Sequence, residues 1–191
     1  RESGVPLSDV EGIAVPAGPG SFTGLRIGLA AAKGLSYALG IPCTGVSTLL
    51  ALAFVQRGTP GICCAALDAR RGEIYNALFA IEGGRVRRLC ADRAVPAAAL
   101  AEDPLLSEQR DILLCGDGAS LCAGVLRDRA VLAPAHLRLQ RASGVGAAAL
   151  SAGEWGPPAA LRPSYLRLSQ AERERAQRLA QAPQQEKEEG Q

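Results

Sequence analysis

The sequence predicts an α/β fold, in which short buried strands alternate with helices. Strand, helix, strand and helix patterns follow one another over residues 10–56 with the spacing of a parallel crossover unit, and a similar alternation returns over residues 112–153. Between them, three strand patterns over residues 62–90 are separated by short turns, as in an antiparallel meander. The 191 residues, 48% of them hydrophobic and 21% charged, suit one large domain or two small lobes.

The first crossover unit is delimited by turn residues. The apolar run over residues 10–15 predicts a buried strand, which the Pro- and Gly-rich run over residues 16–20 ends. A long helix is predicted over residues 21–39, because Gly40 and then a proline stop it. The remaining patterns of this unit are a strand at residues 43–47 and a helix at residues 48–56.

The meander is followed by a second lobe. Strands are predicted at residues 62–67, 73–81 and 85–90, with turns at residues 68–72 and 83–84. Residues 94–110, with two prolines and mixed charge, indicate a boundary. Beyond it come a strand (112–115), a turn (116–118), a helix (119–127), a short strand (131–132) and a helix (145–153). The predicted organisation is a first lobe over 1–94, a second lobe over 95–170 and a charged, disordered tail over 171–191.

Composition argues against several classes of function. The formal charge of +2, from 21 basic and 19 acidic residues, is too small to drive nucleic-acid binding by phosphate neutralisation alone. The six cysteines form no C-x-x-C pair, so we expect small hydrophobic residues in a reducing compartment. With no secretory signal and no apolar run long enough to span a bilayer, the sequence predicts a cytoplasmic protein without membrane contact.

The segment GPGSFTGLR joins the first strand to the long helix. Gly18, Gly20 and Ser21 could present backbone N–H groups to a phosphate, helped by the helix dipole. The spacing nonetheless fails both named fingerprints, because a P-loop needs Gly-Lys-Ser/Thr and the third glycine of a dinucleotide loop would come one residue earlier. A nucleotide-proximal loop and a tight turn that only steers the helix both remain open.

The long helix carries one narrow polar stripe, which runs from Arg26 to Tyr37. The other positions are nearly all apolar, whereas a surface helix needs only one apolar stripe, so burial on two sides is predicted. Its own sheet would cover one side. On the other, small residues four apart at Gly24, Gly28 and Ala32 would let a second body approach closely. The alternative is a helix wrapped by its own domain.

Candidates for chemistry are few. A metal site needs several ligands at suitable spacing, and His136 is the only histidine, so we predict no metal and no catalytic residue. Asp68 and Asp117 stand in polar turns, where a carboxylate commonly bonds nearby backbone N–H groups. Direct RNA contact and a solvated protein face are the two interpretations of the arginines Arg70, Arg71, Arg85, Arg87 and Arg88.

Four segments resemble the TsaB, or YeaZ-type, family. The first, GPGSFTGLRIGLAAAKGLSYALGIPCTGVSTLLALA, is similar to the signature region of that family. LDARRGEIYNALF, CGDGA and LRPSYLR follow in the same order as similar segments of the family, and the match is collinear from about residue 2 to residue 173. The resemblance implies an actin-like ASKHA fold of two ribonuclease-H-like lobes.

The resemblance also implies a function. TsaB-type proteins are non-catalytic and pair with TsaD, which transfers a threonylcarbamoyl group to an adenosine beside the anticodon of tRNA, and TsaE joins the pair. ATP and metal would belong to that partner complex, with no cofactor in this subunit, and tRNA would be reached through the complex only. A small-molecule kinase of the same superfold and a glycoprotease-like enzyme are the rival readings.

The dimer surface of the family includes the helix after GPGSFTG. The resemblance therefore implies a TsaD interface, with self-association as the fallback, formed by Ser21, Phe22, Gly24, Leu25, Gly28, Leu29, Ala32 and Leu35.

The sequence departs from the family pattern at its start. The family begins with a strand pair carrying an Asp-Thr-Ser-type loop and then a helix, for which this sequence, without methionine, has no counterpart. We therefore expect a first lobe that lacks roughly 55–60 residues, with an unpaired edge on the strand at residues 10–15 and poor solubility. Pro16 and Ala17 also replace a more flexible pair, which stiffens the turn.

Overall fold

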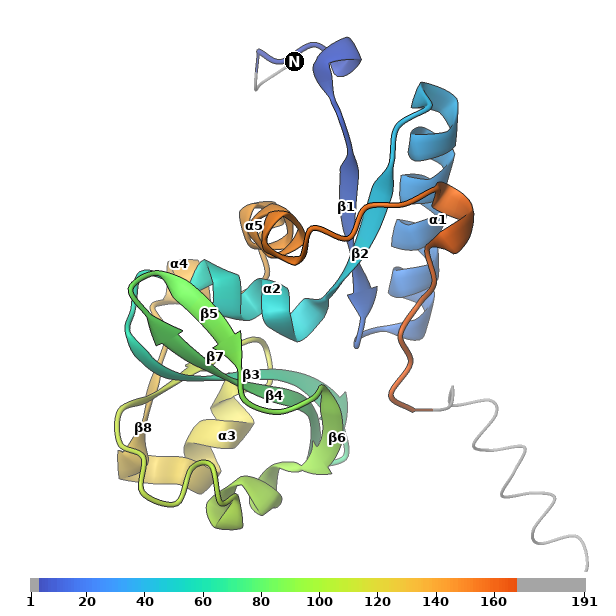
Figure 1. Ribbon diagram of the computed structural model, residues 1–191. Helices are drawn as coiled ribbons and strands as arrows, with labels where there is room; N and C mark the ends of the chain where they lie inside the picture. Colours follow the sequence, from blue (N-terminus) through green and yellow to red (C-terminus); the bar gives the residue numbers. More distant parts are fainter. Residues whose placement is uncertain (1–3, 168–191) are drawn as a thin grey trace, which may run out of the picture.

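The computed structural model describes residues 4–167, which form two packed units (Figure 1). The smaller unit is a two-stranded parallel sheet of β1 (Ile13–Gly18) and β2 (Cys43–Ser47), preceded by the short 3-10 helix η1 (Leu7–Asp9). Helix α1 (Phe22–Leu39) packs on one face of this sheet and α5 (Ala142–Ala152) on the other, because alternate residues of β1 point to opposite faces.

The larger unit is a six-stranded sheet of strand order β5-β4-β3-β7-β8, with β6 pairing with β4 beside β5. Its strands are β3 (Gly61–Arg70), β4 (Glu73–Glu82), β5 (Arg85–Arg88), β6 (Arg93–Pro96), β7 (Ile112–Cys115) and β8 (Ala130–Leu132). The helical elements between β2 and α5 are α2 (Thr48–Val55), η2 (Ala97–Glu102), α3 (Ala119–Leu126), η3 (Arg127–Arg129) and α4 (Ala135–Arg138), whereas η4 (Pro158–Ala160) packs against α1 in the smaller unit. The predicted α/β class and the antiparallel meander are confirmed.

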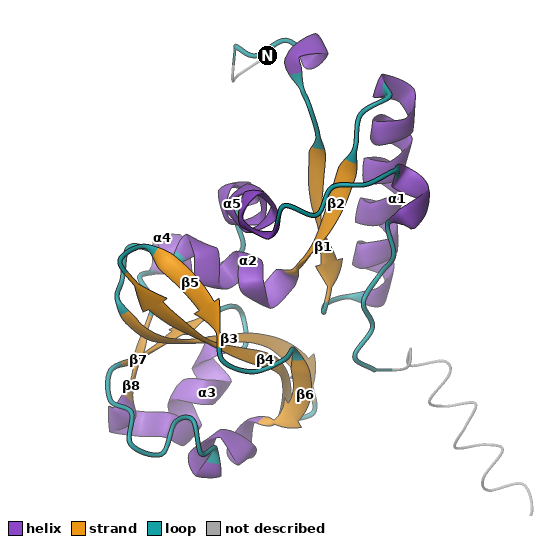
Figure 2. Cartoon of the chain, in the orientation of Figure 1, coloured by secondary structure: helices purple, strands orange, loops and turns teal. Residues whose placement is uncertain are grey.

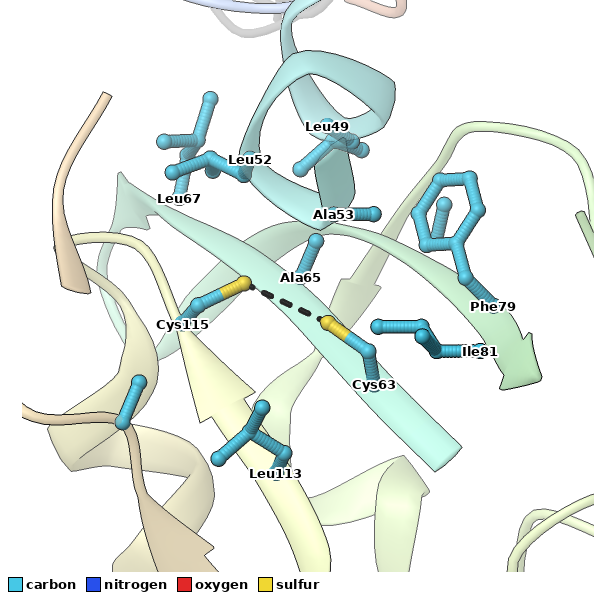
Figure 3. Close-up of a cluster of buried hydrophobic side chains, with 12 residues drawn as sticks. Leu49, Leu52, Ala53, Cys63, Ala65, Leu67, Phe79, Ile81, Leu113 and Cys115 are labelled. Atoms are coloured by element: carbon cyan, nitrogen blue, oxygen red, sulfur yellow. Dashed lines mark hydrogen bonds between the residues drawn. The ribbon is translucent and has the colours of Figure 1, made fainter. Parts of the chain in front are cut away.

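The core of the larger unit lies on both faces of β3. Residues Cys63 and Ala65 point to the face covered by α2, where Leu49 and Leu52 of that helix meet them (Figure 3). Cys64 points to the opposite face, which α3 and η2 cover. Both faces are therefore dry, which accounts for the continuous apolar run of this strand.

The cysteines behave as the small hydrophobic residues that the sequence predicted, since all but Cys90 are buried and every one is a free thiol. The sulfur atoms of Cys63 and Cys115 lie 3.5 Å apart between β3 and β7. This hydrogen bond and burial raise the pKa of the Cys115 thiol well above its ordinary value. The Cys115 thiol therefore stays protonated at neutral pH, and the two side chains contribute packing.

The ends of α1 follow from its sequence. The hydroxyl of Ser21 accepts a hydrogen bond from the backbone of Gly24, and Gly40 ends the helix in the left-handed conformation with φ of 66°. The preceding strand differs from its prediction, because it runs from Ile13 to Gly18 and continues through Pro16. A proline fits a strand whose N–H side faces an open edge, so it does not end this one.

The sheets divide the chain at a different place from the predicted boundary. Residues 94 and 95 lie inside β6, and the six-stranded sheet takes strands from both sides of that point. The strand pairing groups residues 61–132 in the larger unit. The smaller unit combines the segment that ends with β2 and the segment that begins with α5. The tail predicted at 171–191 lies outside the described residues.

Helices α2 and α5 lie between the two sheets and pack on each other (Figure 2). A Cβ atom at Gly144 of α5 would lie 2.4 Å from the backbone oxygen of Ala51 in α2, so only glycine allows this approach. Within residues 4–167, no helix combines the length and the apolar character needed to cross a membrane.

The outer edge of β1 has no strand beside it in the part of the chain that the structure describes. The outer edge of β2, by contrast, is bridged by two hydrogen bonds between Cys43 and Gly156. A hollow of about 260 Å³ lined by Val15 and Pro16 adjoins the open edge. The buried hydroxyl of Thr48 also lines this hollow and makes no hydrogen bond to any described residue.

Hydrogen exchange tests whether this edge is open in solution. The backbone N–H of Ile13 donates to the carbonyl of Pro42, so strand alternation directs Val15 to the same side and Ala14 to the open edge. We expect the Ala14 amide to exchange markedly faster than those of Ile13 and Val15, as measured by NMR. Equal protection at all three would contradict an open edge and mean that something pairs with it.

Candidate functional site: the cleft at the GPGSF loop

A cleft of about 490 Å³ lies where the two units meet. Residues 19–22 of the loop after β1 form one wall, and residues 67–70 at the end of β3, with Asp117, form the other. Residues 164–167 line it as well. Carboxyl ends of parallel strands are the usual place for ligands in α/β proteins, because loops and helix N-termini converge there.

The loop is shaped by a close backbone approach. Gly18 has a φ of 129°, and a Cβ atom there would lie 2.1 Å from the backbone oxygen of Ser164. The backbone N–H of Ser164 donates to the carbonyl oxygen of Ala17 at 2.7 Å. Gly18 is therefore required by local geometry, which supports the tight-turn interpretation of this position.

An aromatic pair fixes the residues after Ser164. The rings of Phe22 and Tyr165 stack with centroids 4.7 Å apart. The guanidinium of Arg26 lies 3.9 Å from the Phe22 ring centroid, and its Nε donates to the Tyr165 hydroxyl at 3.1 Å. The N-terminal end of α1 and the chain segment that contains Tyr165 thus form one surface beside the cleft.

The opposite wall is a network of turn hydrogen bonds. The Asp117 carboxylate accepts from the backbone N–H of Asp68 at 3.0 Å, and Asp68 accepts from the backbone N–H of Arg70 at 2.7 Å. The bond between Asp68 and Arg70 confirms the turn-stabilising interpretation of Asp68, whereas Asp117 accepts from a residue 49 positions earlier and joins its turn to the end of β3. Arg70 and Arg71 have φ values of 69° and 57°, left-handed conformations that few residues other than glycine adopt.

Arg167 connects the units on the far side of the cleft. Its guanidinium pairs with the carboxylate of Glu73 on β4 and also donates to the backbone oxygen of Ala69 at 3.2 Å. Ser164 is hydrogen-bonded to β1, and Arg167, three residues later, is bonded to the larger unit. This short segment therefore joins the two units.

The cleft offers hydrogen-bonding and ion-pairing groups. Its lining contains carboxylates, guanidinium groups and hydroxyls, but His136 lies outside it on α4, where its backbone oxygen accepts from Arg141. Within residues 4–167, the His, Cys, Asp and Glu side chains form no group of three that could hold a metal ion.

The loop residues predicted to approach a phosphate fall in two environments. Gly18 is buried against Ser164, whereas Gly20 and Ser21 line the cleft. The Ser21 hydroxyl already accepts the helix-capping hydrogen bond from Gly24. A phosphate site at this loop stays a prediction.

The predicted interface residues also fall into two groups, one buried and one exposed. Leu25, Leu29 and Ala32 are buried in the chain's own core with at most 8% exposure, so they are not available to a partner. Gly28 is half-buried beside Val15. The predicted residues that remain at the surface are Ser21, Gly24 and Leu35, with Phe22 half-buried on Tyr165.

Sequence reasoning missed two groups. Ile27 and Tyr37 of α1 are 66% and 84% exposed. Ile27 lies on the same side of the helix as Leu35, whereas Tyr37, two positions after Leu35, points away from it. The sequence of a helix that is apolar on nearly every side does not show which side the sheet covers. The exposed positions of α1 could therefore not be identified from the helical periodicity alone. Tyr165 was part of a recognised motif but nothing in the sequence linked it to Phe22.

Solved structures share this architecture. A Pseudomonas aeruginosa protein with similarity to peptidase YeaZ matches with a TM-score of 0.74 and 32% identity, over 87% of this chain and 78% of its own. The YeaZ of Pseudomonas aeruginosa matches with a TM-score of 0.70 and 30% identity, over 86% and 78%. The fold and its cleft therefore define a mixed α/β protein of the YeaZ structural type.

Sequence comparison gives the family. The profile of TsaD, tRNA N6-adenosine threonylcarbamoyltransferase, matches residues 1–172. The Bacillus subtilis and Escherichia coli tRNA threonylcarbamoyladenosine biosynthesis proteins TsaB are 37% identical over 120 residues and 45% identical over 76 residues. The chain belongs to the TsaD family and is of its TsaB, or YeaZ, type. These alignments cover 63% and 38% of this chain, and they span about half and about a third of those relatives.

Two glycine substitutions test the loop geometry. Gly18→Ala would place a methyl group against the Ser164 oxygen at an unfavourable φ, so we expect a loss of about 2–4 kcal/mol in the free energy of unfolding. Gly20→Ala is the matched control, because its Cβ atom would be 3.8 Å from Leu25, and it should cost less than about 1 kcal/mol. Urea unfolding curves measure both, and equal midpoints for the two variants would refute the close approach.

Proposed function

We propose that this chain is a non-catalytic TsaB-type subunit that docks on TsaD and supports threonylcarbamoyl transfer to tRNA. The observation that carries the proposal is the outward face of α1. Ile27 and Leu35 are more than half exposed there, although both are large apolar side chains. Large exposed apolar surfaces rimmed by polar residues mark protein interaction sites.

The exposed face is continuous along the helix. At about 100° per residue, the side chains that share the outward direction with Ile27 are small or apolar: Thr23, Gly24, Ala30, Ala31, Gly34, Leu35 and Ala38, all of them exposed. Small residues allow the backbone of a partner helix to come close, at interaxial distances of roughly 8–10 Å. Because Ile27 and Leu35 are already partly covered, at 66% and 52% exposure, burying the rest of each would contribute roughly 1–2 kcal/mol.

The polar end of this face adds specificity. Arg26, Phe22 and Tyr165 form a stacked and hydrogen-bonded group beside the apolar stripe. Arginine and tyrosine are common energetic anchors of protein interfaces, because they combine contact area with directional hydrogen bonds. We expect this group to lie at the rim of the contact, with the apolar stripe at its centre.

The proposal extends to the assembly in which the subunit acts. It includes an actin-like arrangement of two lobes, TsaE joining the pair, ATP and metal held by the partner complex, and tRNA reached through that complex in the cytoplasm. The lining of the cleft supports a binding role, since its two carboxylates already accept backbone hydrogen bonds and no lysine lies among the residues that line it. Self-association through the same α1 face is the fallback.

A nucleotide-dependent enzyme is the second candidate, and the cleft with Asp68 and Asp117 is the observation in its favour. Under our proposal, titration of the chain alone with ATP and Mg²⁺ should give only the heat of dilution. If ATP instead bound saturably and Asp68→Asn weakened this binding, the result would favour the hypothesis of a kinase.

One substitution in α1 tests the docking face. Leu35→Glu would strand a charge in an apolar contact, which costs about 3–5 kcal/mol and should weaken TsaD binding by about 100-fold or more. Because Leu35 is 52% exposed in the isolated chain, its thermal melt should remain close to wild type. Co-purification and biolayer interferometry measure the interaction.

Leu150→Glu is the matched control, since Leu150 is an equally apolar residue of α5 with 77% exposure. It should retain TsaD at the wild-type level. A folded Leu35→Glu variant that binds TsaD as well as this control does would exclude the α1 face as the docking surface.

A further inference from the structure

The β4–β5 hairpin carries arginines that neither the core nor the cleft uses. β5 is an edge strand of the larger sheet (Figure 1). Its Val86 packs toward α2, so strand alternation directs Arg85 and Arg87 to the opposite side, where both are exposed. They line a hollow of about 540 Å³ together with Ala80, Glu82 and Gly83.

The neighbouring Arg88 shows what an arginine with a structural role looks like in this strand. Its guanidinium pairs with Asp92, donates to the backbone oxygen of Cys90 at 3.3 Å and lies 4.8 Å from the Phe79 ring centroid. The guanidinium groups of Arg85 and Arg87 have no ion pair or hydrogen bond within residues 4–167. Their charges are therefore free to meet a ligand.

The spacing and surroundings of this pair suit a chain of phosphates. Two residues on one strand face are separated by roughly 6.5–7 Å, so the two guanidinium groups can contact successive anionic groups. A guanidinium donates two parallel hydrogen bonds to phosphate oxygens. Ala80 and Gly83 add little side-chain volume to the hollow, so it has room for a sugar–phosphate backbone.

One carboxylate opposes the two arginines. Glu82 stands directly across from Arg85 in the antiparallel register, whereas Arg87 stands across from Ala80. The two arginines outnumber the one carboxylate, so the hollow keeps a net positive charge. This charge is small, and it suits one part of an extended contact better than tight binding of a single anion. The ligand that suits so small a charge is a polyanion that other parts of an assembly also bind.

We infer that the Arg85–Arg87 face of β5 contacts the phosphate backbone of tRNA. The inference rests on the proposed function, which places the chain in a complex that acts on tRNA, and it adds a direct contact by this subunit. Phosphate contacts position a nucleic acid without reading its sequence, so any tRNA should be bound equally well at this face.

The competing explanation is protection of the sheet edge. Charged side chains on edge strands prevent pairing with other chains, and arginine serves this purpose. Charge reversal separates the two explanations. Glutamate protects an edge as well as arginine does, whereas it repels phosphate.

The experiment compares the full chain with R85E/R87E and with the control R57E/R127E, which makes the same change in net charge. Arg57 and Arg127 are also exposed and have no ion pair within the described residues, but neither lines the hollow. Binding of a fluorescent tRNA is measured by anisotropy between about 50 and 200 mM salt, for the chain alone and for its complex with TsaD. Native gels check that each variant stays monodisperse.

We expect R85E/R87E to weaken tRNA binding in both settings and to lower the slope of log affinity against log salt by about 1.5, as two lost phosphate contacts predict. The control should keep the wild-type slope. Unchanged tRNA binding by R85E/R87E, or an equal loss in the control, would overturn the inference. Failure of the wild-type chain to bind TsaD would instead refute the proposed function, and the titration of the chain alone would still decide the RNA contact.

Discussion

The hydrogen bond from the Ser164 backbone to the Ala17 carbonyl holds the end of β1 against a distant part of the chain. It forms only because Gly18 has no side chain to collide with Ser164. The next residue, Tyr165, is thereby placed on Phe22, and Arg167 reaches Glu73 in the larger unit. The cleft, the rim of the α1 face and the Arg167–Glu73 ion pair between the two units all depend on this one contact.

Close backbone packing also replaces large side chains elsewhere in the molecule. Aromatic residues make up only 4% of the sequence, and Phe79 is the one aromatic side chain among the largest fully buried residues of the described chain. Glycine and alanine instead bring elements close together, as at Gly144 against Ala51 between α5 and α2. Such contacts tolerate little added volume, because protein interiors are packed at close to crystal density. The packing of α5 on α2 therefore sets how closely the two sheets approach each other.

The sequence predicted elements well where local chemistry decides them. The cap at Ser21 and the stop at Gly40 place α1 within one residue, and the bounds of β2 are the predicted ones. Prediction failed where the presence or absence of a neighbouring strand decides the local structure. Pro16 continues β1 because its N–H side meets no strand in the described chain, and residues 93–96 form a strand because β4 offers them an edge.

The candidate site shows the same division. The turn role of Asp68 could be predicted, since its carboxylate accepts from the backbone of Arg70, two residues further on. The bond from the distant Asp68 backbone to Asp117 could not, because only the pairing of β3 with β7 brings them together. Which face of α1 is outward could not, because Leu25 and Ile27 are equally apolar and only the packing of β1 distinguishes them. Tyr165 belongs to the site only through a fold contact with Phe22 that sequence spacing does not encode.

The smaller unit is assembled from both ends of the described chain, with the larger unit inserted between β2 and α5. On the ribosome, β1, α1 and β2 emerge before the helix that covers their second face has been made. Synthesis proceeds at roughly 5–20 residues per second, so about 100 residues keep that face uncovered for seconds. The inserted sheet can close meanwhile on its own hairpins, whereas the outer unit must wait for contacts of high sequence separation. We therefore expect completion of the cleft to come late in folding, and a nascent chain that stops before residue 142 to expose the face of β2 that α5 covers.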